Sequence, residues 1–310
     1  MKVVITPRGF ARYGREELEL FQEKGIEVDF NDTGHPYSPD VFLDKIRDAD
    51  GLIVGVDECS RAVLEQCPSL KVICKFGVGV DNIDCVYAHE HCIEVGRTVG
   101  SNAQSVAEHA MALMFADARS IVSVVTAVKS GSWAKPTGIE LAGKTLGIVG
   151  FGAIGRRLAT LAHGIGMQVL AYDAFPVDRS VADSLSVGVS TLDQVLKNSD
   201  YVSVHVPLLD STRGMISQHE FDLMGSQSCL INASRGGVVD EHALLQALKS
   251  GSIRSACFDV MEDEPPAADN PLLSLDNFML TSHIGSRTHE SERRTCRMAA
   301  DIVLKVLQGS

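Results

Sequence analysis

Hydrophobic and polar positions follow two alternating periodicities along most of the chain. Short runs of apolar, β-branched residues are separated by longer stretches in which apolar residues recur at helical spacing. Parallel strands need a crossover connection, usually a helix, before the next strand can pair. The pattern therefore predicts an α/β fold built from doubly wound parallel sheets.

The predicted strands fall into two sets, which indicates two domains. The first set is Val3–Thr6, Glu27–Phe30, Leu52–Gly55, Lys71–Lys75 and Cys92–Val95. The second set is Thr145–Gly150, Gln168–Tyr172, Tyr201–His205, Ser228–Asn232, Ser255–Asp259 and Phe278–Thr281. A length of 310 residues agrees with two domains, because a single hydrophobic core rarely grows that large.

Helical patterns connect the strands. They include Gly14–Lys24, Pro39–Arg47 with Ser38 as its cap, and the closing stretch Thr288–Leu307. Between the two sets we predict one long helix over Ala103–Lys129, with apolar residues around much of its circumference. That pattern fits a helix buried in the core and a helix that forms a dimer equally well.

Charge and cysteine usage narrow the class of protein. A net charge of −12 argues against nucleic acid and against anionic membranes as partners, since both attract basic surfaces. Eight cysteines without a C-x-x-C pair indicate reduced thiols, so we expect a cytoplasmic protein without structural disulfides. We expect no signal peptide in residues 1–6, and no membrane span in 110–128, which Asp117 and Arg119 interrupt.

A glycine motif marks a candidate dinucleotide site. Gly150, Gly152 and Gly155 follow an apolar strand and precede a helical pattern in TLGIVGFGAIG. In this motif the first glycine permits a tight turn, the second lets the backbone approach a pyrophosphate, and the third lets helix pack on strand. Asp173 ends the next strand, where a carboxylate accepts hydrogen bonds from ribose hydroxyls and repels a 2′-phosphate. The motif therefore predicts NAD rather than NADP.

A second glycine pair has a different interpretation. Gly77 and Gly79 also follow a strand, but Asn82 stands at the third glycine position, and Asp81 and Asp84 would repel a pyrophosphate. We interpret this segment as a backbone nest for a smaller anion.

Three polar residues follow the last predicted strands of the second set. They are Arg235, Glu264 and His283. Ligands of open α/β sheets bind at the carboxyl ends of the strands, which makes these residues candidates for catalysis. Taken singly, each has a plain alternative: a surface cation, a solvated acidic loop and a structural histidine.

The motifs together resemble the D-isomer-specific 2-hydroxyacid dehydrogenase family, over nearly the whole chain. The segments that carry the resemblance are KFGVGVDNID, SVAEHAMALM, LAGKTLGIVGFGAIG, VHVPLLDSTRGMI, LINASRGGVVDEHALLQALKSG, FDVMEDEPP and HIGS. The resemblance implies that Arg235 binds the substrate carboxylate, that His283 is the general acid/base, and that Glu264 hydrogen-bonds its imidazole. These roles suit a histidine that titrates near neutrality and a forked, permanently charged guanidinium.

The resemblance also implies binding residues and a domain plan. Lys75, Val78 and Gly79 join Arg235 and His283 around the substrate. NAD contacts beyond the three glycines and Asp173 come from Phe151, Ala153, Ile154, His205, Val206, Pro207, Ala233, Ser234, Arg235, Asp259, His283 and Gly285. A Rossmann NAD-binding domain at 100–285 is inserted in a flavodoxin-like substrate domain at 1–99 and 286–310, with hinges near Val99, Gly100 and Ser286. Family members are commonly homodimers through the helix at 103–129.

The substrate stays open between two groups of small anionic acids. The motifs are nearest to the phosphoglycerate dehydrogenase branch, but Gly55 and Lys75 stand where that branch commonly carries arginine. We also expect no regulatory domain after the last helix. 3-Phosphoglycerate and the shorter glyoxylate or hydroxypyruvate are comparable candidates, and Arg8 and Arg12 fit a pocket mouth or a plain surface equally well.

Two alternatives and one exclusion complete the sequence predictions. An NAD(H)-sensing corepressor of the same fold is the alternative binding protein. A formate-dehydrogenase-like enzyme is disfavoured, because such enzymes carry Gln where Glu264 stands. No metal site is predicted, since the spacing of Cys85, His89, His91 and Cys92 matches no common zinc pattern.

Overall fold

The chain folds into two compact units. In the computed structural model, which describes residues 1–309, the first unit comprises Met1–Asn102 together with the residues from Arg287 onward. The second unit comprises Ala103–Ser286. The first unit is therefore built from both ends of the chain, and the second from its middle.

The first unit contains a five-stranded parallel sheet. Its strands are β1 (Lys2–Ile5), β2 (Glu27–Phe30), β3 (Gly51–Val54), β4 (Val72–Lys75) and β5 (Glu94–Arg97). Their order is β2-β1-β3-β4-β5, with every pair parallel. This is the flavodoxin-like order, in which the direction of winding reverses between β1 and β3.

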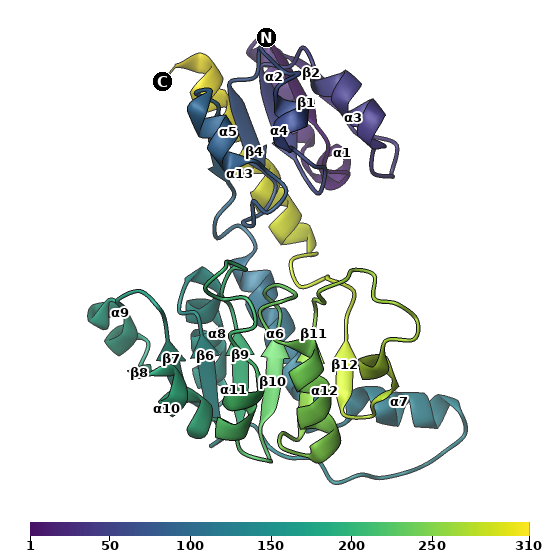
Figure 1. Cartoon of the computed structure of the whole chain (residues 1–310), viewed down its shortest axis with the longest axis vertical. Helices are drawn as coiled ribbons and strands as arrows, with labels where there is room; N and C mark the ends of the chain where they lie inside the picture. Colours follow the sequence, from purple (N-terminus) through teal and green to yellow (C-terminus); the bar gives the residue numbers. More distant parts are fainter. Residues whose placement is uncertain (310) are drawn as a thin grey trace. The chain divides into compact units, whose positions relative to one another are not determined.

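Helices cover both faces of this sheet, as Figure 1 shows. They are α1 (Gly9–Tyr13), α2 (Arg15–Glu23), α3 (Pro39–Ile46), α4 (Arg61–Leu64), α5 (Cys85–Glu90) and α13 (His289–Gln308). One buried cluster joins the sheet to α1, α2 and α13, and another joins it to α3, α4 and α5. Ser38 caps α3 as predicted, accepting the Val41 N–H at 3.5 Å.

The second unit contains a seven-stranded parallel sheet. Its strands are β6 (Thr145–Val149), β7 (Gln168–Tyr172), β8 (Gly188–Val189), β9 (Tyr201–Val204), β10 (Cys229–Asn232), β11 (Ser255–Phe258) and β12 (Phe278–Leu280). The order is β12-β11-β10-β9-β6-β7-β8, so that β8 and β12 form the two edges (Figure 1). This is the Rossmann order with one added strand, and the winding reverses between β6 and β9.

The helices of the second unit also form two layers. They are α6 (Ala103–Ala118), α7 (Ile121–Lys129), α8 (Ala153–Gly164), α9 (Arg179–Ser184), α10 (Leu192–Lys197), α11 (Gln218–Leu223) and α12 (Glu241–Ser250), with a short 3₁₀ helix η1 at Pro271–Ser274. Residues of α6 and α8 pack in one buried cluster and residues of α11 and α12 in the other. The predicted fold class, two doubly wound parallel α/β sheets, is confirmed.

All eleven predicted strands match observed strands to within two residues at either end. One strand was missed. The two-residue β8 pairs with β7 and is too short to produce an alternating pattern.

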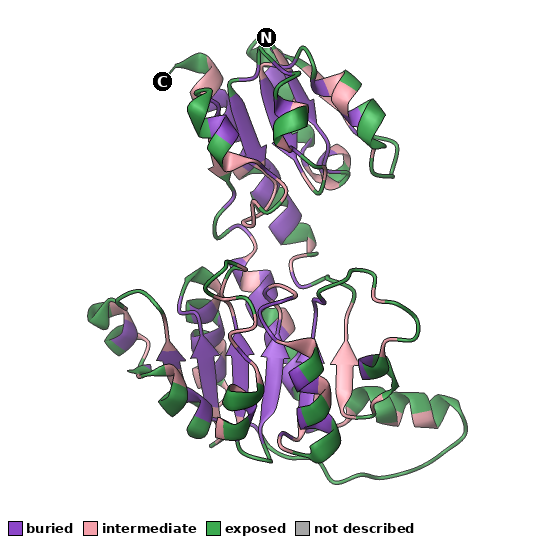
Figure 2. Ribbon diagram, in the orientation of Figure 1, coloured by how far each residue is buried: buried purple, intermediate pink, exposed green. Residues whose placement is uncertain are grey.

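The prediction of one helix over Ala103–Lys129 is wrong. The chain bends by 62° between α6 and α7, where Ser120 adopts the left-handed conformation with φ of 51°. The two helices also differ in burial, because α6 contributes nine buried residues and α7 none. Figure 2 shows this contrast as a largely exposed α7. The even spread of apolar residues was thus the sum of a core helix and a surface helix.

Within residues 1–309, no single helix has both the length and the apolar composition to cross a membrane; α6 and α7 satisfy those two criteria only as a bent pair.

Candidate active site

Six strands of the second unit carry the predicted cofactor and catalytic residues at one edge of their sheet. The glycine motif follows β6, Asp173 follows β7, His205 follows β9, Arg235 follows β10, Glu264 follows β11 and His283 follows β12. All strands are parallel, so their carboxyl ends share this edge. The fold thereby brings to one side of the sheet residues that are spread over more than a hundred positions of the sequence.

The fold itself requires two of the three glycines of the motif. Gly150 has φ of 101°, and a Cβ there would lie 2.7 Å from the carbonyl oxygen of His205. A Cβ on Gly155 would lie 2.4 Å from the Gly150 oxygen, where α8 packs against the loop. A Cβ on Gly152 would have no heavy atom within 4 Å. The protein itself does not demand Gly152, which fits a ligand that approaches the backbone there.

The surroundings of the loop also fit a dinucleotide. Helix α8 starts after Gly152 without a side-chain cap, so its first N–H groups and its dipole face the loop. The Asp173 carboxylate accepts the N–H of Phe151 at 2.7 Å and the N–H of Phe175 at 3.0 Å. These contacts place a carboxylate directly beside the glycine loop.

His205 lies next to the glycine loop, and its side chain is neutral. Burial lowers its pKa to about 4, and its Nε2 atom lies 2.9 Å from Ser203 Oγ. Its Nδ1 is buried without a hydrogen-bond partner among the described residues. The imidazole therefore adds no positive charge to the cofactor edge at neutral pH.

His283 and Glu264 lie within hydrogen-bonding distance, the contact that the family resemblance implies. His283 Nδ1 lies 2.7 Å from Glu264 Oε2, and Glu264 Oε1 accepts the N–H of Met261 at 3.1 Å. Both side chains are partly exposed, by 46% and 37%. The carboxylate is thus anchored to its own loop and fixes the orientation of the imidazole through Nδ1.

The loop that carries Arg235 packs against the loop that carries Glu264. Asn232 Nδ2 donates to the Arg235 carbonyl at 3.1 Å, and Arg235 Nη1 donates to the Ser234 carbonyl at 2.7 Å. A Cβ on Gly236 would lie 1.9 Å from the Met261 carbonyl oxygen, so only glycine permits this approach. The sequence analysis assigned no role to Asn232 or Gly236. The pair Gly236-Gly237 directly after Arg235 was a signal that the backbone there approaches another segment closely.

Lys75, Val78 and Gly79 belong to the first unit. Lys75 Nζ donates to the Gly55 carbonyl at 2.5 Å and to Asn82 Oδ1 at 2.6 Å. The Asp57 carboxylate accepts the hydroxyl of Thr6. These residues follow β1, β3 and β4, around the point where the winding of this sheet reverses. Loops at such a point form the usual ligand crevice of a doubly wound sheet.

Potential metal ligands gather elsewhere in the second unit. Among residues 1–309, the one group with ligand atoms within 4.8 Å of one another is Asp117, Cys229 and Cys257. The Asp117 carboxylate already accepts hydrogen bonds from Tyr201 at 2.8 Å and Ser255 at 2.6 Å, and pairs with Arg254 at 2.9 Å. A cation would have to displace that arginine, so we assign this cluster a structural role.

The fold and the residues at this edge fit a nicotinamide dinucleotide beside a hydrogen-bonded imidazole and carboxylate. The family model for the NAD-binding domain of D-isomer specific 2-hydroxyacid dehydrogenases matches residues 111–285. The chain therefore belongs to the D-isomer-specific 2-hydroxyacid dehydrogenase family, a family of NAD-dependent enzymes.

Individual relatives agree with this assignment. A D-3-phosphoglycerate dehydrogenase of Methanocaldococcus jannaschii is 42% identical over 95% of this chain, which spans only 56% of that relative. A glyoxylate reductase of Korarchaeum cryptofilum is 36% identical over 98% of this chain and 94% of its own length. A crystal structure of D-lactate dehydrogenase from Aquifex aeolicus, in complex with NAD and lactic acid, superposes with a TM-score of 0.83. It is 28% identical and covers 100% of this chain and 96% of its own.

Proposed function

We propose that the protein transfers a hydride between NAD and the C2 carbon of a small D-2-hydroxy or 2-keto acid. One observation carries the proposal: the pair of His283 and Glu264, with 2.7 Å between Nδ1 and Oε2, at the same sheet edge as the glycine loop. An acid/base group beside a nicotinamide is the minimum that alcohol oxidation requires.

His283 and Glu264 each have a defined role in this reaction. Bound at the glycine loop, NADH would supply a hydride to C2 of a keto acid, and NAD would accept one from a hydroxy acid. His283 Nε2 donates the proton to the carbonyl oxygen in the reduction and accepts the hydroxyl proton in the oxidation. Glu264 stabilises the imidazolium form and holds the ring in one orientation.

Arg235 binds the substrate and takes no part in the proton transfer. Its guanidinium suits a carboxylate, because two parallel N–H bonds match the two oxygens. The same charge polarises the C2 carbonyl and stabilises the oxyanion that develops during reduction. We assign the backbone N–H groups of Val78 and Gly79 in the first unit to substrate binding as well.

We assign the second unit as the NAD-binding domain and the first as the substrate domain. The glycine loop and Asp173 lie in the second unit, which supports its assignment. For the domain boundaries we retain 1–99 and 286–310 for the substrate domain and 100–285 for the NAD-binding domain. The remaining NAD contacts, at 151–154, 205–207, 233–235, Asp259, His283 and Gly285, stay part of this proposal.

The charges of the first unit favour an unphosphorylated substrate such as glyoxylate or hydroxypyruvate. A phosphate group needs several cationic or N–H donors directed at it. Lys75 donates to two protein oxygens, Gly55 offers no side chain, and Asp57 adds a negative charge at the same sheet edge. The named relatives do not decide the substrate, since they include both phosphoglycerate dehydrogenases and glyoxylate reductases.

We also propose that the protein is a cytoplasmic homodimer that pairs through α7. Ile121, Val122, Val125 and Val128 expose between 43% and 53% of their surface on this helix. This exposed apolar row supports pairing with a second copy of the chain, since contiguous exposed apolar surface is uncommon on a monomer.

An NADH oxidation assay with a panel of 2-keto acids tests the function. We expect turnover of glyoxylate or hydroxypyruvate, weaker use of phosphohydroxypyruvate, and loss of at least about 100-fold in kcat for His283→Ala. Arg235→Lys should raise KM for the keto acid, since the charge stays but the fork is lost. NADH binding without turnover of any keto acid would refute the enzyme and favour the NAD(H)-sensing corepressor.

A further inference from the structure

His109, for which no role was predicted, contacts the loop that carries His283. It lies on α6, and its Nε2 atom is 3.2 Å from Asp259 Oδ1 and 3.0 Å from Thr281 Oγ1. Both partners are distant in sequence, since 172 residues separate His109 from Thr281. The side chains are shielded from water, with exposures of 16% for His109 and 3% for Asp259.

The Asp259 carboxylate in turn holds the backbone after His283. Its Oδ1 accepts the N–H of Ile284 at 2.9 Å, and its Oδ2 accepts the N–H of Gly285 at 2.7 Å. The hydroxyl of Thr281 donates to Oδ1 at 2.5 Å. Burial alone would raise the pKa of Asp259, but these bonds, with that from His109, lower it to about 2.

The backbone that Asp259 holds is an unusual one. His283 has φ of 55°, a left-handed conformation that residues other than glycine adopt only where their surroundings enforce it. The His283 N–H donates to the Asp259 carbonyl at 2.9 Å, so Asp259 binds the loop through both its main chain and its side chain. A Cβ on Gly285 would lie 2.9 Å from Asp259 Oδ2, which leaves no slack at this contact.

We propose that His109 is a positioning residue for the acid/base His283, acting through Asp259. This inference rests on the proposed function only in taking His283 as the acid/base group. The other three donors to Asp259 come from Thr281, Ile284 and Gly285, which belong to the loop itself and would move with it. His109 is the donor on a separate rigid element, so it is the one that ties the carboxylate, and with it the loop, to α6.

The contact between His109 and Asp259 also lies near both points at which the chain crosses from one unit to the other. The chain enters the second unit at Ala103, where α6 begins, and leaves it at Ser286, directly after the loop. His109 therefore fixes the exit segment to the second turn of the entry helix.

A matched pair of variants tests the proposal. His109→Gln keeps an N–H donor at about the position of Nε2, whereas the side chain of His109→Asn is one methylene shorter and ends away from Asp259. We expect His109→Asn to lower kcat about 10- to 100-fold, as small displacements of an acid/base group do, with KM for NADH changed less than about threefold. His109→Gln should recover most of kcat.

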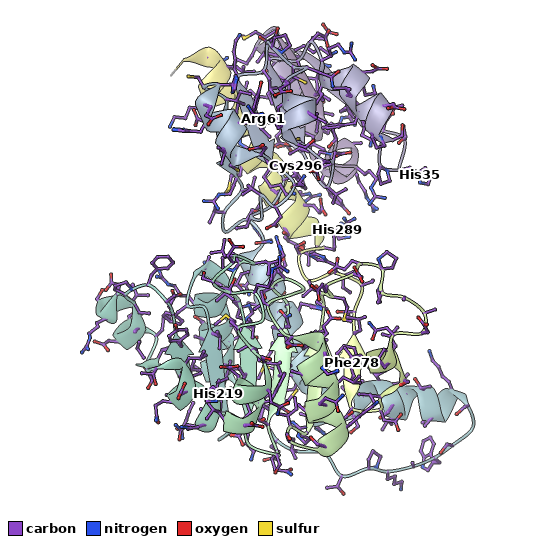
Figure 3. The ribbon with its side chains drawn as sticks, viewed as in Figure 1. His35, Arg61, His219, Phe278, His289 and Cys296 are labelled. Carbon is purple, nitrogen blue, oxygen red and sulfur yellow. The ribbon has the colours of Figure 1, made fainter. Side chains whose placement is uncertain are left out.

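Hydrogen exchange provides a readout that needs no turnover. The amides of Ile284 and Gly285 should exchange at least about tenfold faster in His109→Asn than in the wild-type protein and in His109→Gln, at equal thermal stability. The control is His219→Asn on α11, where Figure 3 shows a histidine away from β12, and it should change neither quantity.

The outcomes separate this proposal from the function. Unchanged exchange at both amides in His109→Asn, or equal loss of kcat in the Asn and Gln variants, overturns the positioning role. An inactive wild-type protein refutes the proposed function instead, and the exchange experiment then still decides whether His109 holds the loop.

Discussion

His283 Nδ1 and Glu264 Oε2 lie 2.7 Å apart on loops that follow two neighbouring strands, β12 and β11. Exposed ion pairs of this kind contribute little to folding stability, because water screens them. The pair is nevertheless anchored from both sides, by the Met261 N–H on Glu264 and by the enforced backbone of His283. The two side chains are therefore held in a fixed geometry, although their contact adds little to the folding stability, as expected for a pair kept for function.

Glu264→Gln should therefore reduce activity without affecting the fold. The amide can still accept a hydrogen bond, but it no longer stabilises a charged imidazolium, so we expect kcat to fall about 10- to 100-fold. Thermal unfolding should stay within about 1 °C, since the pair is exposed. Glu262→Gln is the control, a neighbouring exposed acid outside the pair, and should keep full activity. Equal losses in both variants would contradict the assignment.

Gly152→Ala and Gly155→Ala should separate ligand binding from folding. A Cβ on Gly152 meets nothing within 4 Å, so the fold should persist while the dissociation constant for NADH rises at least about tenfold. A Cβ on Gly155 meets the Gly150 oxygen at 2.4 Å, so that variant should lose about 2 kcal/mol or more of stability. Calorimetry of unfolding and fluorescence titration with NADH measure the two effects. Intact NADH affinity in a folded Gly152→Ala protein would argue against the dinucleotide site.

Asp173→Asn should weaken the preference for NADH over NADPH. The substitution removes the charge that repels a 2′-phosphate and leaves a weaker acceptor for the ribose hydroxyls. We expect the ratio of kcat/KM values for the two cofactors to drop at least about tenfold, corresponding to about 1.4 kcal/mol. Asp183→Asn, on the surface of α9, is the matched control. An unchanged ratio would mean that another residue selects the cofactor.

Val125→Asp should convert the proposed dimer to a monomer. Val125 is 46% exposed on a helix that contributes no buried residue, and a charge there would be buried unpaired at an interface. Sedimentation velocity should show the mass halve for this variant. Val41→Asp on α3 replaces a valine of similar exposure and should leave the mass unchanged. A wild-type monomer would refute the interface outright.

Glu17→Gln should stabilise the protein at neutral pH. Burial raises the pKa of Glu17 above its ordinary value, so the folded state favours the neutral carboxyl. That stability is fully present below about pH 4.3, the pKa of an unfolded glutamate, and is lost as the pH rises through the folded pKa. The melting temperature of the Gln variant should therefore exceed that of the wild type at pH 7, and the difference should vanish near pH 4. Glu16→Gln, one residue away and exposed, should show no such dependence.

Local features of this chain were predictable because their causes are local. The strands were found by their apolar runs, and the roles of Gly150 and Gly155 followed from spacing to strand and helix. The pair of His283 and Glu264 was expected from the resemblance and lies where parallel strands bring their ends together. By contrast, no proline or glycine marks the break between the two helices, where Ser120 is left-handed.

The amino-acid sequence alone determined the class of fold and the glycine loop, since each depends on periodicity or on residues near one another along the chain, whereas the pairing of His283 with Glu264 was expected only from the family resemblance. Only the tertiary structure decided that α7 lies on the surface, that the loops of Arg235 and Glu264 meet at Gly236, and that His109 reaches Asp259. These depend on contacts between segments as much as 150 residues apart, which form when strand order and helix packing are settled together.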